Sequence, residues 1–230
     1  MAGLKRGSRG GGSRLAAIVV LAPVFVLIAA LGTRTGLWSH EIGYDLLAMR
    51  VGVGLAAFGA VAALMMLIYA LRRRASPWLS AVVIAVSAAT IGAYAWQVSR
   101  IMSGPPDDIS TDIAEIPGFG ALDARRGAAG SGETGGVDAC PGAIPAMTQV
   151  APASAVWALQ ESGFSVQGGV TVARVAGTHR GFWFGTVHDA VVRIRPGRTD
   201  VRVAARDGRP HGGEACRLAT LISERLRVVE

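Results

Sequence analysis

The sequence has three long stretches without a single lysine, aspartate or glutamate, and this lack of charge sets the broad class of the protein. Residues 15–31, 46–71 and 79–98 are apolar. Each is close to or above the roughly 20 residues that a helix needs to cross about 30 Å of hydrocarbon. The one arginine inside them, Arg50, lies near a segment end, from where its guanidinium can reach the interface. We therefore expect three transmembrane helices rather than buried helices of a soluble protein.

The first apolar segment has a second interpretation as a signal peptide, because the basic residues Lys5, Arg6, Arg9 and Arg14 precede it. The apolar run is longer than a usual signal sequence, and no clear small-x-small cleavage site stands before a polar start. We expect the segment to be kept as a transmembrane helix, with cleavage as the alternative.

The arginines also predict an orientation. The tail 1–14 is basic and three arginines crowd residues 72–74, whereas the loop 33–45 holds one arginine against two acidic residues. By the positive-inside rule, the N-terminus and the second loop are cytoplasmic. Three crossings then place the chain after about residue 99 on the other side. The prediction is a bacterial inner-membrane protein with a periplasmic C-terminal domain.

The formal net charge of +7 comes from the membrane half of the chain. Residues 1–103 hold 10 of the 23 Lys and Arg residues but only 2 of the 16 acidic ones, so the remainder is close to neutral. Because the excess of basic residues follows the topology, the sequence argues against nucleic-acid binding.

Cysteine is scarce, with only two residues, and both follow the apolar segments. If the domain lies in an oxidising compartment, Cys140 and Cys216 are expected to form a disulfide. Two free buried thiols are the alternative. A metal site is not expected, because no second pair of Cys or His stands nearby at ligand spacing.

The fold class predicted is a membrane protein with three N-terminal transmembrane α-helices followed by a small α+β domain. The expected parts are a cytoplasmic basic tail (1–14), a three-helix membrane region (15–101), an extended leader with a glycine-rich linker (102–136) and a periplasmic domain (137–230). Within the domain we expect a helix from Pro152 that buries Val156, Trp157 and Leu159, about three antiparallel strands and a closing helix. The strands are predicted at 170–176, 182–195 and 199–206, and the closing helix at 213–227.

Alternation in the last two predicted strands gives the sheet an apolar and a basic face. His188, Ala190, Val192 and Ile194 alternate with polar neighbours, and Val201, Val203 and Ala205 do the same. The closing helix carries an apolar stripe that can cover this face, formed by Ala215, Leu218, Ala219, Ile222 and Leu226.

The basic face gives the main functional hypothesis. Guanidiniums on one rigid sheet can bind carboxylate or phosphate groups in a bidentate manner. The candidate ligand-binding residues are Arg193, Arg195, Arg202 and Arg206, with Asp189 beside them and Arg174 as a further member. The partner would be an envelope protein or an anionic envelope molecule. The alternative is a solvated face whose arginines pair with Asp189 and Asp207.

The second candidate function is that of an envelope hydrolase that uses His188 and Asp189. No nucleophile elbow, zinc motif or phosphate-binding loop supports it, so no catalytic residue, metal or cofactor is predicted. His188 falls on the apolar face, where we expect a hydrogen-bonded core residue. In the membrane, the small residues Gly52, Ala56, Ala60 and Ala63 favour close helix packing, either within the chain or in a homo-oligomer.

The leader PPDDISTDIAEIPGF (105–119) places three aspartates next to the membrane region. Asp107, Asp108 and Asp112 lack the oxygen spacing of a calcium loop. We therefore expect a tether that packs on the domain through Ile109, Ile113, Ile116 and Phe119, with Ser110, Thr111 and Asp112 capping nearby backbone groups.

The order of the short motifs resembles a bacterial family named domain of unknown function 1499. The leader DISTD with PGF, the strand FWFGTVHDAVVRIRP (182–196) and the strand TDVRVAARDG (199–208) carry the resemblance. The chain departs from the family pattern at His188, in place of an acidic residue, and at Ala204 and Ala205, in place of hydroxyl residues. The resemblance implies a fold and a membrane location over residues 104–227, but no activity.

Overall fold

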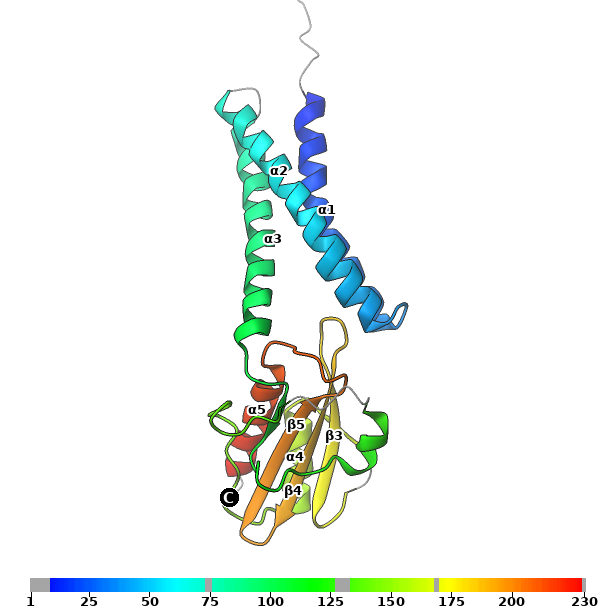
Figure 1. Ribbon diagram of the computed structural model, residues 1–230, viewed down its shortest axis with the longest axis vertical. Coiled ribbons are helices and arrows are strands. Elements are labelled where there is room, and N and C mark those ends of the chain that lie inside the picture. The colour runs from blue at the N-terminus through cyan, green and yellow to red at the C-terminus, as the bar shows by residue number, and fades with distance from the viewer. Residues whose placement is uncertain (1–8, 73–75, 127–132, 168–169, 229–230) are drawn as a thin grey trace, which may run out of the picture. The chain divides into compact units, whose positions relative to one another are not determined.

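A computed structural model describes residues 9–72, 76–126, 133–167 and 170–228, with five strands and three long helices (Figure 1). Most of the basic tail, Arg73, Arg74 and the middle of the glycine-rich linker lie outside the described residues. The chain divides into two compact units. One comprises Met1–Gln97 with Phe182–Gly185, and the other comprises Val98–Gly181 with Thr186–Glu230.

Three helical segments of the first part are long and apolar enough to cross a membrane, as predicted. They are α1 (Arg9–Thr35), the π-helical segment η1 (Glu41–Val51) continued by α2 (Gly52–Leu71), and α3 (Pro77–Ser103). The candidate spans have mean hydropathies of 2.8, 2.4 and 1.7, because almost no charged residue interrupts them.

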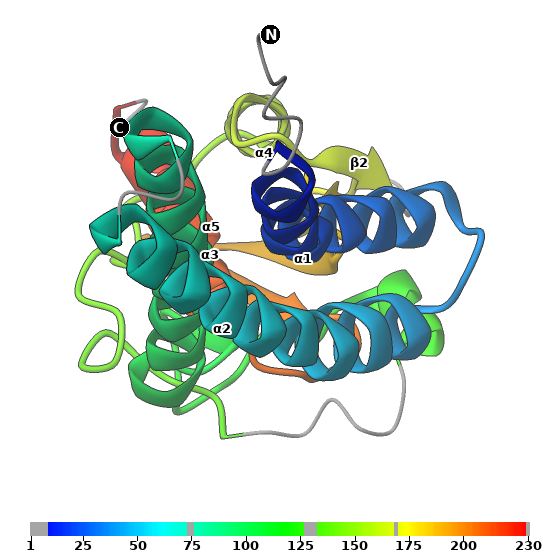
Figure 2. The same ribbon diagram turned by 90° about the horizontal axis from the view of Figure 1, so that it is seen from above.

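Small residues allow α1 and α2 to approach each other closely (Figure 2). Gly52, Ala56 and Ala63 of the predicted stripe are buried, and Ala60 is half-buried. An added Cβ at Gly59 would lie 3.6 Å from the Val19 Cα, so α1 itself occupies this part of the stripe. Packing within one chain therefore accounts for the small residues, and a homo-oligomer stays a prediction.

The C-terminal part contains a five-stranded antiparallel sheet in the order β1-β5-β4-β3-β2. The strands are β1 (Asp108–Ser110), β2 (Ser165–Gln167), β3 (Arg174–Arg180), β4 (Val187–Arg195) and β5 (Arg198–Ala205). The three predicted strands overlap β3, β4 and β5, but β3 begins four and β4 five residues later than predicted. The short edge strands β1 and β2 were not predicted. Gly197 has a φ of 73°, a conformation that glycine adopts without strain, and it makes the predicted turn between β4 and β5.

Two helices cover the apolar face of the sheet, α4 (Pro152–Glu161) and α5 (Glu214–Val228) (Figure 1). Every residue of the predicted α5 stripe is fully buried, as are Leu159 of α4 and the β4 and β5 residues that face them. The predicted burial of Trp157 is wrong, because its side chain is 42% exposed while Ala155 and Ala158 occupy the buried stripe of α4.

The leader packs on the domain, as predicted, and part of it forms the edge strand β1 of the sheet. Ile109 in β1 pairs with Val203 of β5 and is fully buried, and Phe119 is buried on the other face of the sheet. Asp112 Oδ1 accepts hydrogen bonds from the backbone N–H groups of Ala114 and Glu115, which confirms the expected capping. Ile113 and Ile116 are exposed, so two of the four expected anchors are not buried.

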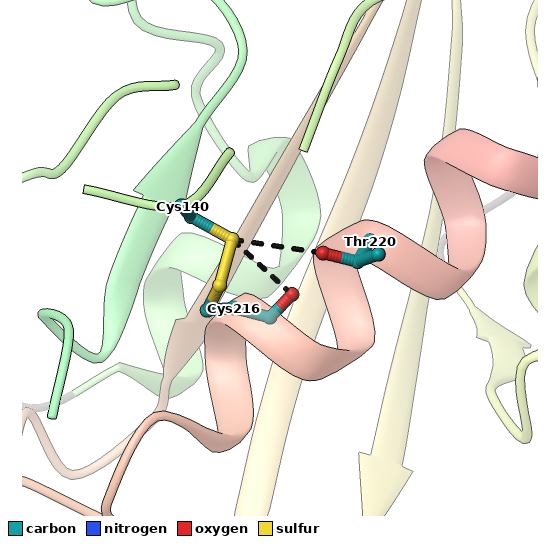
Figure 3. The surroundings of a disulfide bond; sticks show 3 residues. All are labelled: Cys140, Cys216 and Thr220. Atoms are coloured by element: carbon teal, nitrogen blue, oxygen red, sulfur yellow. Dashed lines mark hydrogen bonds between the residues drawn. A yellow bond between two sulfur atoms is a disulfide. The ribbon is translucent and has the colours of Figure 1, made fainter. Parts of the chain in front are cut away.

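A disulfide joins Cys140 to Cys216 at the start of α5, as predicted (Figure 3). The two Cα atoms are 5.6 Å apart and the cysteines are 76 residues apart in sequence. The Cys140 sulfur lies 3.4 Å from the carbonyl oxygen of Cys216 and 3.6 Å from the hydroxyl of Thr220. The bond thus ties the segment that precedes α4 to the helix that closes the core.

Candidate anionic-ligand site

The arginines singled out from the sequence lie on the face of the sheet opposite to the helices. Strand alternation puts them there, since their neighbours Val192, Ile194, Val201 and Val203 are buried in the core. This arginine face consists of Arg174 on β3, Arg193 and Arg195 on β4, Arg198 and Arg202 on β5, and Arg206 just beyond it. The leader and the short 3₁₀ helix η2 (Gly120–Arg125) follow one another along this side.

Asp189 is the fully buried centre of the first group of charges on this face. Arg206 donates to both carboxylate oxygens, at 2.6 and 3.0 Å, and Arg126 donates at 3.3 Å. The Thr178 hydroxyl adds a fourth hydrogen bond, at 2.9 Å. Asp189, proposed from sequence as part of a ligand site, is thus a counter-ion whose acceptor positions are filled by the protein itself.

The second group is a bidentate pair between Arg202 and Asp108 of the leader. Arg202 Nε and Nη2 donate to the two carboxylate oxygens at 2.9 and 2.6 Å. The guanidiniums of Arg202 and Arg126 also lie 4.6 and 4.2 Å from the ring centroid of Phe119. Such cation–π contacts are worth about 0.5–2 kcal/mol each. Arg202 of β5 therefore holds the leader by an ion pair with Asp108 and by stacking on Phe119.

The third group lies at the end of the sheet where β4 turns into β5. The fully buried Asp200 accepts from Arg193, Arg195 and Arg198 at 3.2, 2.6 and 2.7 Å. Asp112 accepts from Arg193 and Arg195 at 2.7 and 2.8 Å, and Glu115 pairs with the same two arginines. Although burial acts against it, the backbone N–H of Glu115 and the Arg195 guanidinium lower the pKa of Asp112.

Arg174 differs from the other arginines of the face. Among the residues that the structure describes, its guanidinium has no hydrogen bond or ion pair, and an added Cβ at Gly120 would lie 3.0 Å from its Nη1. It lines an open pocket of about 410 Å³ together with Arg193 and Arg195. The remaining walls are largely apolar and come from Phe119, Gly120, Ala121, Thr171, Ala173, Ala176 and Ile194. The pocket thus combines three guanidiniums with an apolar floor.

The two residues of the enzyme hypothesis do not form a catalytic pair. His188 and Asp189 are consecutive in β4 and point to opposite faces of the sheet, His188 toward the helices and Asp189 toward the arginines. In the described part of the chain, no group of three or more His, Cys, Asp or Glu residues could hold a metal ion. His188 and Asp189 therefore do not face a common substrate position.

His188 is a core residue, as expected, but not a hydrogen-bonded one. It is fully buried, and neither ring nitrogen has a partner among the described residues, although its ring contacts that of His211 edge-on at 5.4 Å. Burial lowers the pKa of His188 from 6.5 to about 4, and the nearby His211 acts in the same direction. The imidazole is therefore neutral at physiological pH.

This depressed pKa predicts a loss of stability in acid. The unfolded chain binds a proton at this histidine near pH 6.5, whereas the folded chain does so only near pH 4. Between these values the free energy of unfolding should fall as the pH falls, by up to about 3 kcal/mol at the acid end. Urea unfolding of wild type and His188→Leu across this range should give a smaller slope for the variant. Equal slopes would contradict the assignment.

Comparisons of the chain with protein families, curated proteins and solved structures found no match. The resemblance to the family named domain of unknown function 1499 therefore stays a prediction.

Proposed function

We propose that the protein is a non-enzymatic, membrane-anchored binding protein whose α+β domain holds a carboxylate- or phosphate-bearing ligand in the pocket beside Arg174. The charge balance at this end of the sheet carries the proposal. Four guanidiniums gather there, and three carboxylates neutralise all but one of them: Arg174, Arg193, Arg195 and Arg198 against Asp112, Glu115 and Asp200. The unneutralised cation lines the pocket.

The register of the strands adds to this imbalance. Arg174 of β3 lies directly opposite Arg193 of β4. Like charges at directly opposed positions destabilise a sheet, and a bound anion between them removes that repulsion. Two neighbouring guanidiniums also suit the forked geometry of carboxylate and phosphate groups. Arg202 and Arg206 do not take part in this proposal, because Asp108 and Asp189 already bind them in a bidentate manner.

The position of the pocket favours a ligand that approaches from the aqueous side. Four residues separate the end of α3 from the start of β1, whose first residue, Asp108, pairs with Ala204 near the end of β5. The row of Arg174 and Arg193 lies at the opposite end of β3 and β4. An anionic envelope polymer or a soluble anion fits this position better than a phospholipid headgroup. The periplasmic location that we propose rests on the arginine distribution and agrees with the disulfide.

Calorimetric titration of the full chain in a neutral detergent tests the site, with pyrophosphate as the phosphate probe and citrate as the carboxylate probe. Arg174→Gln should weaken binding by about tenfold or more, because hydrogen bonds to charged groups are worth about 1.5–3 kcal/mol. Arg180→Gln is the matched control, since Arg180 lies on the same strand at its other end. No binding by the wild type, or an equal loss in both variants, would reject the site.

A further inference from the structure

The loop between β3 and β4, GFWFGT (181–186), presents aromatic side chains that the fold of the domain does not use. Phe182 is 67% exposed and Trp183 is 60% exposed, and their rings pack edge-on with centroids 5.0 Å apart. The backbone N–H of Gly181 donates to the carbonyl of Thr186 at 2.8 Å and closes the loop. Exposed rings of this size mark a contact surface, because leaving them in water forgoes the free energy of their burial.

The backbone of the loop is held in an unfavourable conformation. Phe184 has a φ of 55°, in the left-handed region that a bulky side chain rarely occupies, and Gly185 follows with a φ of 62°. Such a residue costs on the order of 1 kcal/mol or more and is found where function requires it. The Phe184 ring packs edge-on against that of Tyr44, with centroids 5.1 Å apart, whereas the rings of Phe182 and Trp183 stay exposed.

The register of the sheet places this loop at the edge where the chain arrives from α3. Asp108 of β1 pairs with Ala204, which pairs with Asp189, which pairs with Thr178, so one row crosses four strands. On one side of this row, β1 is preceded by the segment that comes from α3. Because β3 runs in the opposite direction to β1, it continues from Thr178 to Arg180 toward that same side. The loop therefore projects beyond the row on the side of α3.

Chain lengths allow the end of α3 and the tip of the loop to lie at a similar level. Five Cα steps separate Ser103, the last residue of α3, from Asp108, a reach of at most roughly 17 Å. From Thr178 to Phe182 the strand and its loop extend roughly 13 Å in the same direction. Arg100 in the last turn of α3 also donates to the carbonyl of Gly212, at 2.7 Å, so this helix end is bonded to the segment that follows β5.

The chemistry of the loop fits one surface in particular, the interfacial zone of a bilayer. Tryptophan and phenylalanine bury their rings at the headgroup level, and basic residues nearby are attracted to anionic lipids. Arg180, which is exposed, stands two residues before Phe182, and no acidic residue occurs in the sequence from Arg174 to His188. Both the aromatic character and the sign of the charge are therefore those of a membrane-contacting tip.

We propose that the exposed rings of Phe182 and Trp183 insert into the interface of the bilayer that anchors the chain, and so form a second membrane contact of the protein. This inference rests on the proposed membrane anchoring and is independent of the anionic-ligand pocket. It holds for either orientation of the chain in the membrane.

A fluorescent label at a single new cysteine tests the insertion, because both native cysteines are held in the disulfide. Trp183→Cys carries the label in vesicles of phosphatidylethanolamine and phosphatidylglycerol. Pro196→Cys, at the exposed turn between β4 and β5, is the aqueous control, and Phe58→Cys, exposed on α2, is the membrane control. We expect position 183 to show blue-shifted emission and loss of fluorescence with doxyl-labelled lipid, as position 58 does, and position 196 to respond only to aqueous iodide.

Three results would overturn the inference, and they are distinguishable. Iodide quenching at position 183 would place the tip in water, whereas protection from both quenchers would bury it against protein, such as the loop 36–45 of the same chain. In both cases lipid quenching at position 58 would leave the membrane anchoring intact. Absence of lipid quenching at position 58 would reject the anchoring and the inference together.

Discussion

Replacing Asp189 by asparagine is expected to lower the free energy of unfolding of the α+β domain by about 3–5 kcal/mol. The carboxylate is fully buried and binds Arg206 and Arg126 at distances of 2.6 to 3.3 Å. Asparagine keeps the shape of the side chain but leaves two partly buried guanidiniums without their counter-charge. Removal of one partner of a buried ion pair costs more than the pair contributes, because the remaining charge stays desolvated.

Urea unfolding of the full chain in detergent, followed by near-ultraviolet circular dichroism, measures this effect. Asp138→Asn is the matched control, because Asp138 undergoes the same chemical change at an exposed position of the same domain. If Asp189→Asn changes the free energy of unfolding no more than the control does, the charges on this face are paired too weakly to hold it together.

Local patterns of the sequence predicted the elements whose neighbours are close in the chain. The stripe of α5 repeats at helical spacing over 12 residues, and the turn at Pro196 and Gly197 is specified by the residues that form it. The start of β3 was misplaced because residues 170–176 have an apolar pattern. Thr171 instead forms a turn with Arg174, in which the backbone of each donates to the carbonyl of the other.

The pairing of charges could not be predicted, because the partners lie far apart in the sequence. Arg202 and Asp108 are 94 residues apart, and Arg193 and Asp112 are 81 apart. The sequence alone predicts a packing tether for the acidic leader and a free basic face for the arginines. In the structure they are largely each other's counter-ions, which leaves Arg174 as the exception. The near-neutral net charge of residues 104–230 did indicate that the acidic and basic side chains of this part pair with each other.

For His188, too, the sequence pattern predicted the position of the side chain but not its surroundings. Alternation along β4 correctly placed the imidazole on the apolar face. Whether its nitrogens find partners depends on the atoms that α5 and the 207–213 segment bring near, and no periodicity encodes that. The depressed pKa is thus a consequence of tertiary packing rather than of the strand.

Removing the disulfide should lower the free energy of unfolding of the domain by about 4 kcal/mol, since the bond closes a loop of 76 residues in the unfolded chain. The double variant Cys140→Ala, Cys216→Ala measures this by the same urea unfolding. Dithiothreitol should lower the stability of the wild type and leave the double variant unchanged, which separates the loss of the crosslink from other effects of the reductant. Equal stability of the two proteins would show that the crosslink does not constrain the unfolded chain.

The same bond also tests the proposed location, because a disulfide persists on the oxidising side of a membrane and is reduced in the cytosol. We expect Cys140 and Cys216 to resist a thiol-blocking reagent in denatured lysates of cells quenched in acid, and to react after reduction. Alkaline phosphatase fused after Glu230 should be active in the same cells, because the enzyme folds only where its own disulfides form. Free thiols with an inactive fusion would place the domain in the cytosol, and the search for an anionic ligand would then move to cytosolic metabolites.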